Sequence, residues 1–222
     1  MSHESTPLQL FGHPFSSYTQ KALIALWETD TIFEFRHLEE GDNGATWAGL
    51  WPMSKMPVLV DGQRTVVETS IIIEYLQIAH PGTAALIPAN PMTALDVRFM
   101  DRVFDLHVMD AMQIAVDSQL GKVPLDPSEG LRLARERLER IYGWLDRRLE
   151  GLTWATGEAF TMADCAAAPF LFYADWVHEI DQTHTNLRAY RARLLARPTV
   201  ARAVEGGRPY RDYFPLGAPD RD

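Results

Sequence analysis

The sequence has a single cysteine, Cys165, among its 222 residues. A disulfide within the chain is therefore impossible, and this usage of cysteine is typical of a protein from a reducing compartment. Cys165 stands among alanines in an apolar segment. We therefore expect it to be an inert core residue.

Clusters of positive charge and long apolar runs are lacking too. The chain carries 21 basic and 30 acidic residues, a formal net charge of −9, and no run of Lys or Arg. This balance argues against nucleic acid as a partner. The most apolar stretch, residues 166–174, is too short to span a bilayer, and residues 1–11 have neither the basic nor the apolar region of a signal peptide. We expect a cytoplasmic protein that has no membrane partner.

Metal-binding patterns are the third absence. The seven histidines show neither HExxH nor another metal-ligand spacing, so we expect no metal. What the chain does have is apolar residues, 46% of the total, against 23% charged residues. A globular protein with one large or two small domains is therefore expected.

Residues 1–80 alternate between strand and helix patterns. Alternating or apolar strand runs are followed by helical spacing, and Asp61-Gly62 between two apolar runs is typical of a hairpin. The expected strands are 8–11, 32–38 and the two arms of the hairpin within 56–68, with helices near 22–29 and over 69–79. Residues 41–51 are expected to be a loop with room for one helical turn. This order predicts a mixed four-stranded sheet with helices packed on it.

Residues 92–222 show only helical patterns, after a proline-rich linker at 81–91. The first predicted helix covers 92–120 and carries two apolar stripes, so it should pack on two sides. The stripes are Leu95, Phe99, Val103, Leu106 and Met100, Phe104, Val108, Met112. A capping box, Thr161 to Asp164, predicts the start of a later apolar helix.

Two serines at the start of the first helix are candidates for chemistry. Ser17 and Gln20 match the S-x-x-Q capping box, so Ser17 is the expected cap. Ser16 is then left without a structural task, at a helix N-terminus suited to an anion. No nucleophile elbow surrounds it, and His13 is the only nearby base, so an activated serine is not indicated.

Two further segments offer polar groups. At Lys55-Met56-Pro57 a proline opens a strand, which indicates either an ordinary edge-strand start or a cis peptide bond. At Glu68-Thr69-Ser70 a strand leads into a helix. Thr69 or Ser70 is expected to cap that helix, and its N-terminus offers a second anion site beside the Glu68 carboxylate.

Four blocks in order resemble the cytosolic glutathione S-transferases over nearly the whole chain. They are FGHPFSSYTQKALIALWE, WPMSKMPVLVDG, ETSIIIEYL and FTMADCAAAPF. The resemblance implies an α/β thioredoxin-like N-terminal domain (1–80), an all-α C-terminal domain (92–222) and a homodimer. It also implies a cis Met56–Pro57 bond.

The same resemblance implies the site. Glutathione is the co-substrate, Glu68 and Thr69 hold its γ-glutamyl end, and Lys55, Met56 and Pro57 belong to the same site. The first strand lacks the tyrosine of some classes and the loop lacks the cysteine of others. The chain thus resembles the serine-using theta-like and phi-like groups, of a bacterial-looking kind, in which Ser16 matches the catalytic position and Ser17 is the alternate.

The implied reaction joins glutathione to a small hydrophobic electrophile, as in detoxification. Its pocket is expected between the domains, lined by His13 and Phe15 and by Val108 and Met112, although each of these is also a plausible core residue. Two rival functions stay open. One is a non-catalytic module that binds glutathione or apolar ligands, and the other is a glutathione-dependent isomerase or dehalogenase.

Overall fold

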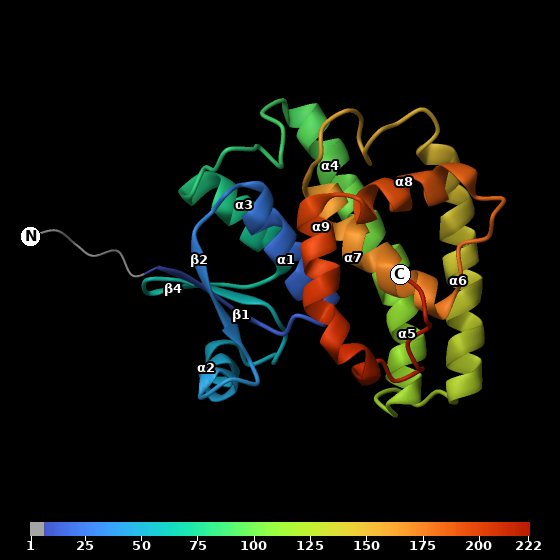
Figure 1. The fold of residues 1–222 in the computed structure, drawn as a ribbon, viewed down its shortest axis with the longest axis horizontal. Helices are drawn as coiled ribbons and strands as arrows, with labels where there is room; N and C mark the ends of the chain where they lie inside the picture. The colour runs from blue at the N-terminus through green and yellow to red at the C-terminus, as the bar shows by residue number, and fades with distance from the viewer. Residues whose placement is uncertain (1–6) are drawn as a thin grey trace, which may run out of the picture. The chain divides into compact units, whose positions relative to one another are not determined.

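The structure, a computed structural model, describes residues 7–222 and is shown in Figure 1. The chain divides into two compact units, one ending at Ile87 and the other comprising Pro88–Asp222. The Gln77 side chain fixes the end of the first unit, because its amide nitrogen donates to the Ile87 carbonyl at 2.7 Å and its oxygen accepts from the Ile87 N–H at 2.8 Å.

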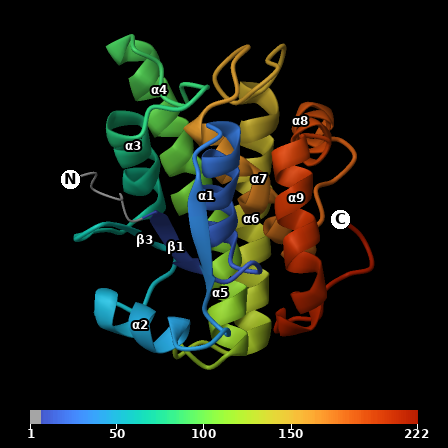
Figure 2. The same cartoon turned by 60° about the vertical axis from the view of Figure 1, so that its left-hand side comes forward.

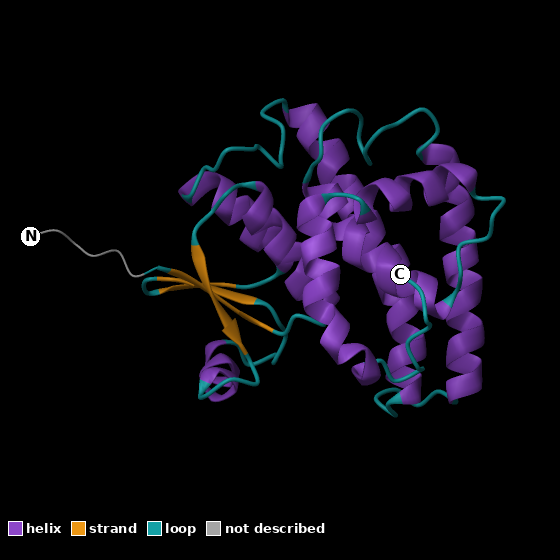
Figure 3. Ribbon diagram, viewed as in Figure 1, coloured by secondary structure: helices purple, strands orange, loops and turns teal. Residues whose placement is uncertain are grey.

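The first unit is a mixed four-stranded sheet with three helices (Figure 3). Its elements are β1 (Leu8–Gly12), α1 (Ser17–Glu28), β2 (Phe33–His37), α2 (Asn43–Leu50), β3 (Val58–Asp61), β4 (Arg64–Val66) and α3 (Thr69–Ala79). The strand order is β2-β1-β3-β4, with β1 parallel to β2 and antiparallel to β3, and β4 antiparallel to β3. The mixed sheet predicted from the sequence is confirmed.

Helices α1 and α3 pack against each other and on one face of this sheet. The buried cluster between them combines alternate strand residues with one stripe of each helix. Its members include Leu8, Leu10, Leu59, Leu23, Leu26, Ile72 and Leu76. At the end of β1, a Cβ added to Gly12 would lie 2.6 Å from Cγ2 of Thr19, so this close approach of strand to helix requires glycine.

The second unit contains only helices. They are α4 (Pro91–Val103), the π-helical η1 (Phe104–Met109), α5 (Asp110–Gln119), α6 (Pro127–Arg148), α7 (Met162–Val177), α8 (Thr185–Leu195), α9 (Pro198–Gly207) and the 3₁₀ segment η2 (Arg208–Tyr213). The all-helical prediction for this half is confirmed. In the part of the chain from residue 7 onward, no helix has the length and apolar content needed to cross a membrane.

Helix α7 is the centre of the second unit and contacts α4, η1 and α8 (Figure 2). Every one of its residues is buried, Cys165 among them. Its predicted capping box is confirmed, because Asp164 accepts from the N–H and the hydroxyl of Thr161 at 2.8 and 2.9 Å.

The predicted helix over 92–120 is helical throughout, but the expectation of one regular α-helix is wrong. A π-helical segment, η1, interrupts it at Phe104–Met109. The wider turn holds extra backbone, which rotates the residues that follow relative to those before. The stripe of Met100, Phe104, Val108 and Met112 is buried, whereas Leu95, Phe99 and Leu106 are about half exposed.

Candidate functional site

The register of the sheet brings the predicted segments of the first unit to one edge. Gly12, the last residue of β1, lies beside His37, the last residue of the parallel strand β2. Phe11 pairs with Val58, so Pro57 lies next to Gly12. Leu59 pairs with Val66, and continuing that antiparallel register places Glu68 beside Pro57. The starts of α1 and α3 therefore follow from the same edge of the sheet.

Ser16, not Ser17, caps α1. The Ser16 backbone is extended, at φ −73° and ψ 121°, and its hydroxyl oxygen accepts from the Thr19 N–H at 3.3 Å. The predicted Ser17–Gln20 capping box is therefore wrong by one residue. The Gln20 side chain turns instead to the preceding loop and donates to the Pro14 carbonyl at 2.8 Å. The loop leads into the helix one residue earlier because the Ser16 N–H donates to the His13 carbonyl at 2.9 Å.

The cap leaves Ser16 able to donate. A hydroxyl has one hydrogen and two lone pairs, so accepting from Thr19 fixes the oxygen and leaves the hydrogen to point elsewhere. Ser16 is partly exposed, whereas Ser17 is only 5% exposed at the first position of the helix. The geometry therefore favours Ser16 over Ser17 as the hydroxyl that meets a ligand.

The Met56–Pro57 peptide bond is cis, as the resemblance implies. Pro57 is buried at the start of β3, Met56 is partly exposed and Lys55 is exposed. The Lys55 carbonyl accepts from the Trp47 indole N–H at 3.1 Å, which ties this segment to α2. The Lys55 ammonium thus stands at the surface on a backbone that is held in place.

Glu68 is the residue that precedes α3, and its side chain makes no capping hydrogen bond. The expectation that Thr69 or Ser70 caps this helix is therefore wrong. The Glu68 backbone has a φ of 66°, in the left-handed region that non-glycine residues seldom adopt. Such a conformation at a helix start is typical of a functional site. Glu68 itself is exposed and Thr69 is buried just behind it.

The structure also brings a lysine to this site that the sequence analysis did not single out. The side chain of Lys21 is fully buried, and its ammonium donates to the Ser70 hydroxyl at 2.9 Å. The bond ties α1 to the first turn of α3, behind Ser16 and Thr69. Its sequence signal is a single positive charge within the buried run 19–26. A buried cation at this place favours anions at the two helix starts.

The expected lining residues of the electrophile pocket differ in exposure. His13 and Phe15 are partly exposed in the loop before α1, whereas Val108 and Met112 are buried. Burial favours a core role for the latter pair, and their place in a pocket wall stays a prediction.

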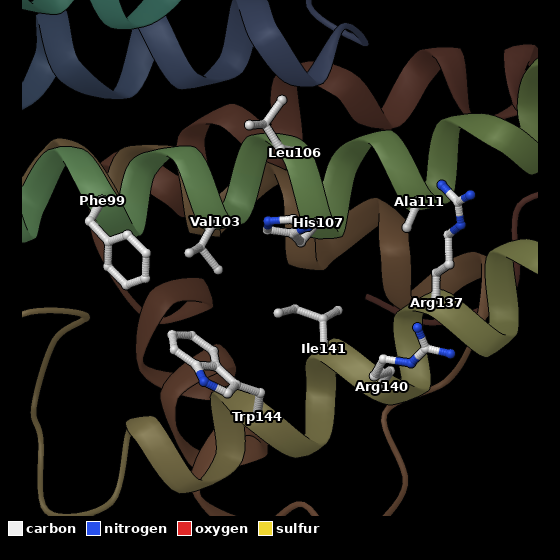
Figure 4. Close-up of a pocket in the computed structure, with 9 residues that line it drawn as sticks. All are labelled: Phe99, Val103, Leu106, His107, Ala111, Arg137, Arg140, Ile141 and Trp144. Carbon is white, nitrogen blue, oxygen red and sulfur yellow. The ribbon is translucent and has the colours of Figure 1, made fainter.

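The second unit has a cavity of its own, of about 600 Å³, between the run α4–η1–α5 and helix α6 (Figure 4). Its lining combines apolar and aromatic side chains with two arginines and a histidine. They are Phe99, Val103, Leu106, His107, Ala111, Arg137, Arg140, Ile141 and Trp144. The Phe99 and Trp144 rings meet edge to face, with their centroids 6.2 Å apart.

Two family models cover most of the chain. Residues 10–84 match the N-terminal domain of glutathione S-transferase and residues 110–193 match its C-terminal domain. The chain belongs to the glutathione S-transferase family. The first unit is thus the thioredoxin-like domain of a glutathione S-transferase, and the second is its helical domain. The predicted family, fold and transferase class are confirmed.

Several proteins are similar to this chain over about nine-tenths of its length. Glutathione S-transferase F13 of Arabidopsis thaliana is 26% identical, over 90% of this chain and 95% of that protein. A probable maleylacetoacetate isomerase of Vibrio cholerae is 25% identical, over 91% of this chain and 97% of its own. A crystal structure of a glutathione S-transferase from Methylobacillus flagellatus with glutathione bound has a TM-score of 0.76 at 24% identity, over 88% of this chain and 98% of the other.

Proposed function

We propose that this glutathione S-transferase activates the thiol of glutathione through Ser16. The observation that carries the proposal is the cap of α1: the Ser16 oxygen is held by the Thr19 N–H, and its hydrogen is left to donate. A serine-using mechanism of the theta-like or phi-like type follows. Ser16 stays neutral and is a donor, not a nucleophile, because its oxygen is held as the cap of α1 and no nucleophile elbow surrounds it.

The chemical task is to hold a thiolate at neutral pH, because the thiolate is the nucleophile. A free thiol with a pKa of about 8.5 is about 3% ionised at pH 7. A hydroxyl donating to the thiolate contributes about 1.5–3 kcal/mol, and the start of a helix about 0.3–1 kcal/mol. A combined shift of ~2 pKa units raises the thiolate to about 75%. The remaining acceleration comes from holding the electrophile against the sulfur.

The proposed reaction joins the glutathione sulfur to an electrophilic carbon. The thiol loses its proton to solvent, and the sulfur lone pair forms a bond to an electrophilic carbon. The electron pair displaced from that carbon leaves with a leaving group or ends on a conjugated acceptor. Small apolar electrophiles are the proposed partners, and His13 and Phe15 are the proposed residues of the pocket that stand beside Ser16.

The other two segments hold the peptide part of glutathione. We place its γ-glutamyl carboxylate on the Thr69 hydroxyl and the first N–H groups of α3, which lack a capping side chain. The Glu68 carboxylate receives the ammonium of the same residue. The Met56 backbone, turned by the cis bond to Pro57, pairs with the cysteinyl residue, and the Lys55 ammonium meets the terminal carboxylate.

We also propose that the protein is a homodimer. Met92, Leu95 and Phe99 follow helical spacing and form an exposed apolar row along α4, and Phe99 also faces the cavity beside Trp144 (Figure 4). Because the row follows one helix, a two-fold axis perpendicular to that helix would place the row of one copy against the row of the other. A second copy of this chain is therefore the proposed occupant of this face.

The test of Ser16 is an ultraviolet titration of bound glutathione. Thiolates absorb where thiols do not, so the absorbance of the complex against pH gives the thiol pKa directly. We expect a pKa near 6.5 in the protein and a value higher by about 1–2 units in Ser16→Ala. Binding without a lowered pKa would leave a non-catalytic glutathione module as the function.

A second candidate activity is glutathione-dependent isomerisation. It is favoured by the similarity to a probable maleylacetoacetate isomerase and by Ser16-Ser17-Tyr18, which resembles the Ser-Ser-Cys of isomerases with tyrosine at the last position. A panel of halogenated aromatics, haloalkanes and cis-unsaturated diacids separates the possibilities. Turnover of the diacids alone would replace the transferase proposal with the isomerase.

A further inference from the structure

The two parallel strands β1 and β2 run into the same local arrangement, a histidine whose ring accepts a backbone N–H two residues further on. His13 follows the end of β1, and its Nδ1 accepts from the Phe15 N–H at 3.1 Å. His37 ends β2, and its Nδ1 accepts from the Glu39 N–H at 3.1 Å. The register of the two strands places these turns side by side.

The two turns are also joined through their side chains. The imidazole rings of His13 and His37 meet edge to face, with their centroids 4.9 Å apart. Nε2 of His13 lies 3.3 Å from a carboxylate oxygen of Glu39. The His13 side chain is only 11% exposed, so it spans the two loops from a largely enclosed position.

These hydrogen bonds decide which ring nitrogen carries the proton. A backbone N–H can only donate, so Nδ1 of each ring is an acceptor and the hydrogen of the neutral ring is on Nε2. In His13 the Nε2 that carries this hydrogen lies 3.3 Å from the Glu39 carboxylate.

The same assignment argues against a metal. Within residues 7–222, His13, His37 and Glu39 are the one trio whose ligand atoms lie within 4.8 Å of each other. A metal on Nε2, however, requires the hydrogen on Nδ1, where each ring already faces an N–H.

The loop held by His13 is the loop that presents Ser16. The His13 carbonyl accepts from the Ser16 N–H, and its ring accepts from the Phe15 N–H, so one residue fixes both amides before the cap. A proton added to Nδ1 turns this acceptor into a donor that faces another donor. The loop must then move, and Ser16 moves with it.

We propose that the neutral imidazole of His13 is a positioning residue for Ser16, and that protonation of its Nδ1 releases the glutathione site in acid. This inference rests on the proposed function of Ser16. The charged and titratable groups facing the ring are Glu39, on the loop after β2, and His37, at the end of that strand. The site is thus matched to a compartment whose pH stays near neutral.

The direction of the pH effect follows from the surroundings of His13. Burial lowers the pKa of its imidazole below 6.5, His37 lowers it further, and the Glu39 carboxylate opposes both. The ring is therefore neutral at pH 7. The bond from Phe15 is fully present above pH 6.5 and is lost as the pH falls through the lower pKa of the folded protein.

The test uses S-methylglutathione, which fills the proposed site but has no thiol to titrate. Calorimetry between pH 5 and 8 measures its affinity for the protein, for His13→Ala and for His13→Asn. An asparagine oxygen accepts the N–H two residues on, as the imidazole does, but has no proton to gain. We expect the affinity of the unaltered protein to fall by about 2- to 10-fold in acid, a change the size of one hydrogen bond.

The variants of His13 distinguish a role in positioning Ser16 from a merely structural role. His13→Asn should bind S-methylglutathione equally at pH 5 and 8, whereas His13→Ala should bind it weakly at both. Glu39→Gln removes a charge that raises the His13 pKa, so the acid loss should move to lower pH. An acid loss in His13→Asn equal to that of the unaltered protein would overturn the proposal.

A second measurement is independent of glutathione. The amide proton resonance of Phe15 should move in an NMR pH titration as its acceptor is lost, and should stay still in His13→Asn. If S-methylglutathione fails to bind at every pH, the proposed function fails while this titration still decides the role of His13. A Phe15 amide resonance that does not change with pH would refute the role proposed for His13. Zinc binding that is abolished in His13→Asn would refute it too.

Discussion

Ser16 combines two tasks in one oxygen atom, and substitutions can separate them. Ser16→Ala should lose about 1 kcal/mol of stability, because α1 loses its cap, as well as raising the thiol pKa. Ser16→Asp keeps a good cap but cannot donate to a thiolate, so it should keep the stability and still raise the pKa. Urea unfolding and the ultraviolet titration measure the two effects.

Ser17→Ala is the matched control for both measurements. Ser17 is buried at the first helical position and makes no cap, so its loss should leave the thiol pKa unchanged. A pKa that rises in Ser17→Ala and not in Ser16→Ala would contradict the assignment of the donor.

Thr69 allows a second prediction at this scale. Thr69→Ala removes a hydroxyl that we place on a carboxylate of glutathione, a bond of about 1.5–3 kcal/mol, so the dissociation constant should rise by about 10- to 150-fold. Thr69→Ser keeps the hydroxyl and should bind within a fewfold of the unaltered protein. Calorimetry at pH 7 makes the comparison, and equal affinities for all three would remove Thr69 from the site.

The sequence indicated which segments meet at one edge of the sheet but not which of two adjacent serines caps the helix. The S-x-x-Q pattern at Ser17 is real, yet Gln20 has a better partner in the Pro14 carbonyl. That partner exists only because His13 folds the loop back on itself, and a short pattern does not include such a contact. Lys21 was missed for a related reason, since only the packed α1–α3 pair shows that its charge is buried.

The start of helix α7 is held by one buried carboxylate, that of Asp164. Asp164 accepts from the Ala155 N–H, the Thr161 N–H and the Tyr190 hydroxyl, all in the core. Burial raises the pKa of this carboxyl, against the hydrogen bonds that lower it. Asp164→Ala leaves the donors without an acceptor, and the free energy of unfolding should fall by about 2–4 kcal/mol.

A surface cap supplies the control. Asp126 caps α6 by accepting from the Ser128 N–H at 2.8 Å, in an exposed position where water can replace it. Asp126→Ala should therefore cost much less than Asp164→Ala in the same urea experiment. Equal losses would mean that the buried network does not add to the cap.

The elements themselves were largely predictable, and the exceptions have local causes. Apolar spacing indicated the strands and α1 and α3 because each buries one face or one stripe, and the capping box indicated the start of α7. The stretch 41–51, expected as a loop, contains α2 (Asn43–Leu50), and none of the residues of this helix is buried to give it an apolar stripe. Helix α9 was not singled out from the sequence; it begins at Pro198, a residue favoured at the first position of a helix. The π-helical turn of η1 was missed because a stripe stepping by three and four residues fits an α-helix equally well.

At the scale of the whole molecule, the prediction is a dimer held by the apolar row of Met92, Leu95 and Phe99 on α4. Light scattering at micromolar concentration should give twice the mass of the chain. Phe99→Glu places a charge in the row and should give the mass of one chain. Ile32→Glu is the control, because Ile32 is 88% exposed in the first unit and outside the row. A single-chain mass for the unaltered protein would refute the dimer.

The two-domain organisation could be predicted because it is encoded in a change of pattern. Strand signals stop before the proline-rich residues 81–91, and the compact units divide at Ile87 and Pro88. The association of copies could not be predicted in the same way. A sequence pattern does not distinguish an apolar stripe that faces the core from one that faces a partner. Here Met100 and Phe104 face the core and Leu95 and Phe99 do not.

The position of Cys165 has a practical consequence. Its thiol is the only one in the chain, and it lies fully buried within α7. Electrophiles that react with the glutathione thiol also alkylate accessible protein thiols. The folded protein has no accessible thiol, because its single cysteine is buried. The protein should therefore escape inactivation by the electrophiles proposed as its substrates, and a thiol reagent added to the native mixture should count the glutathione alone.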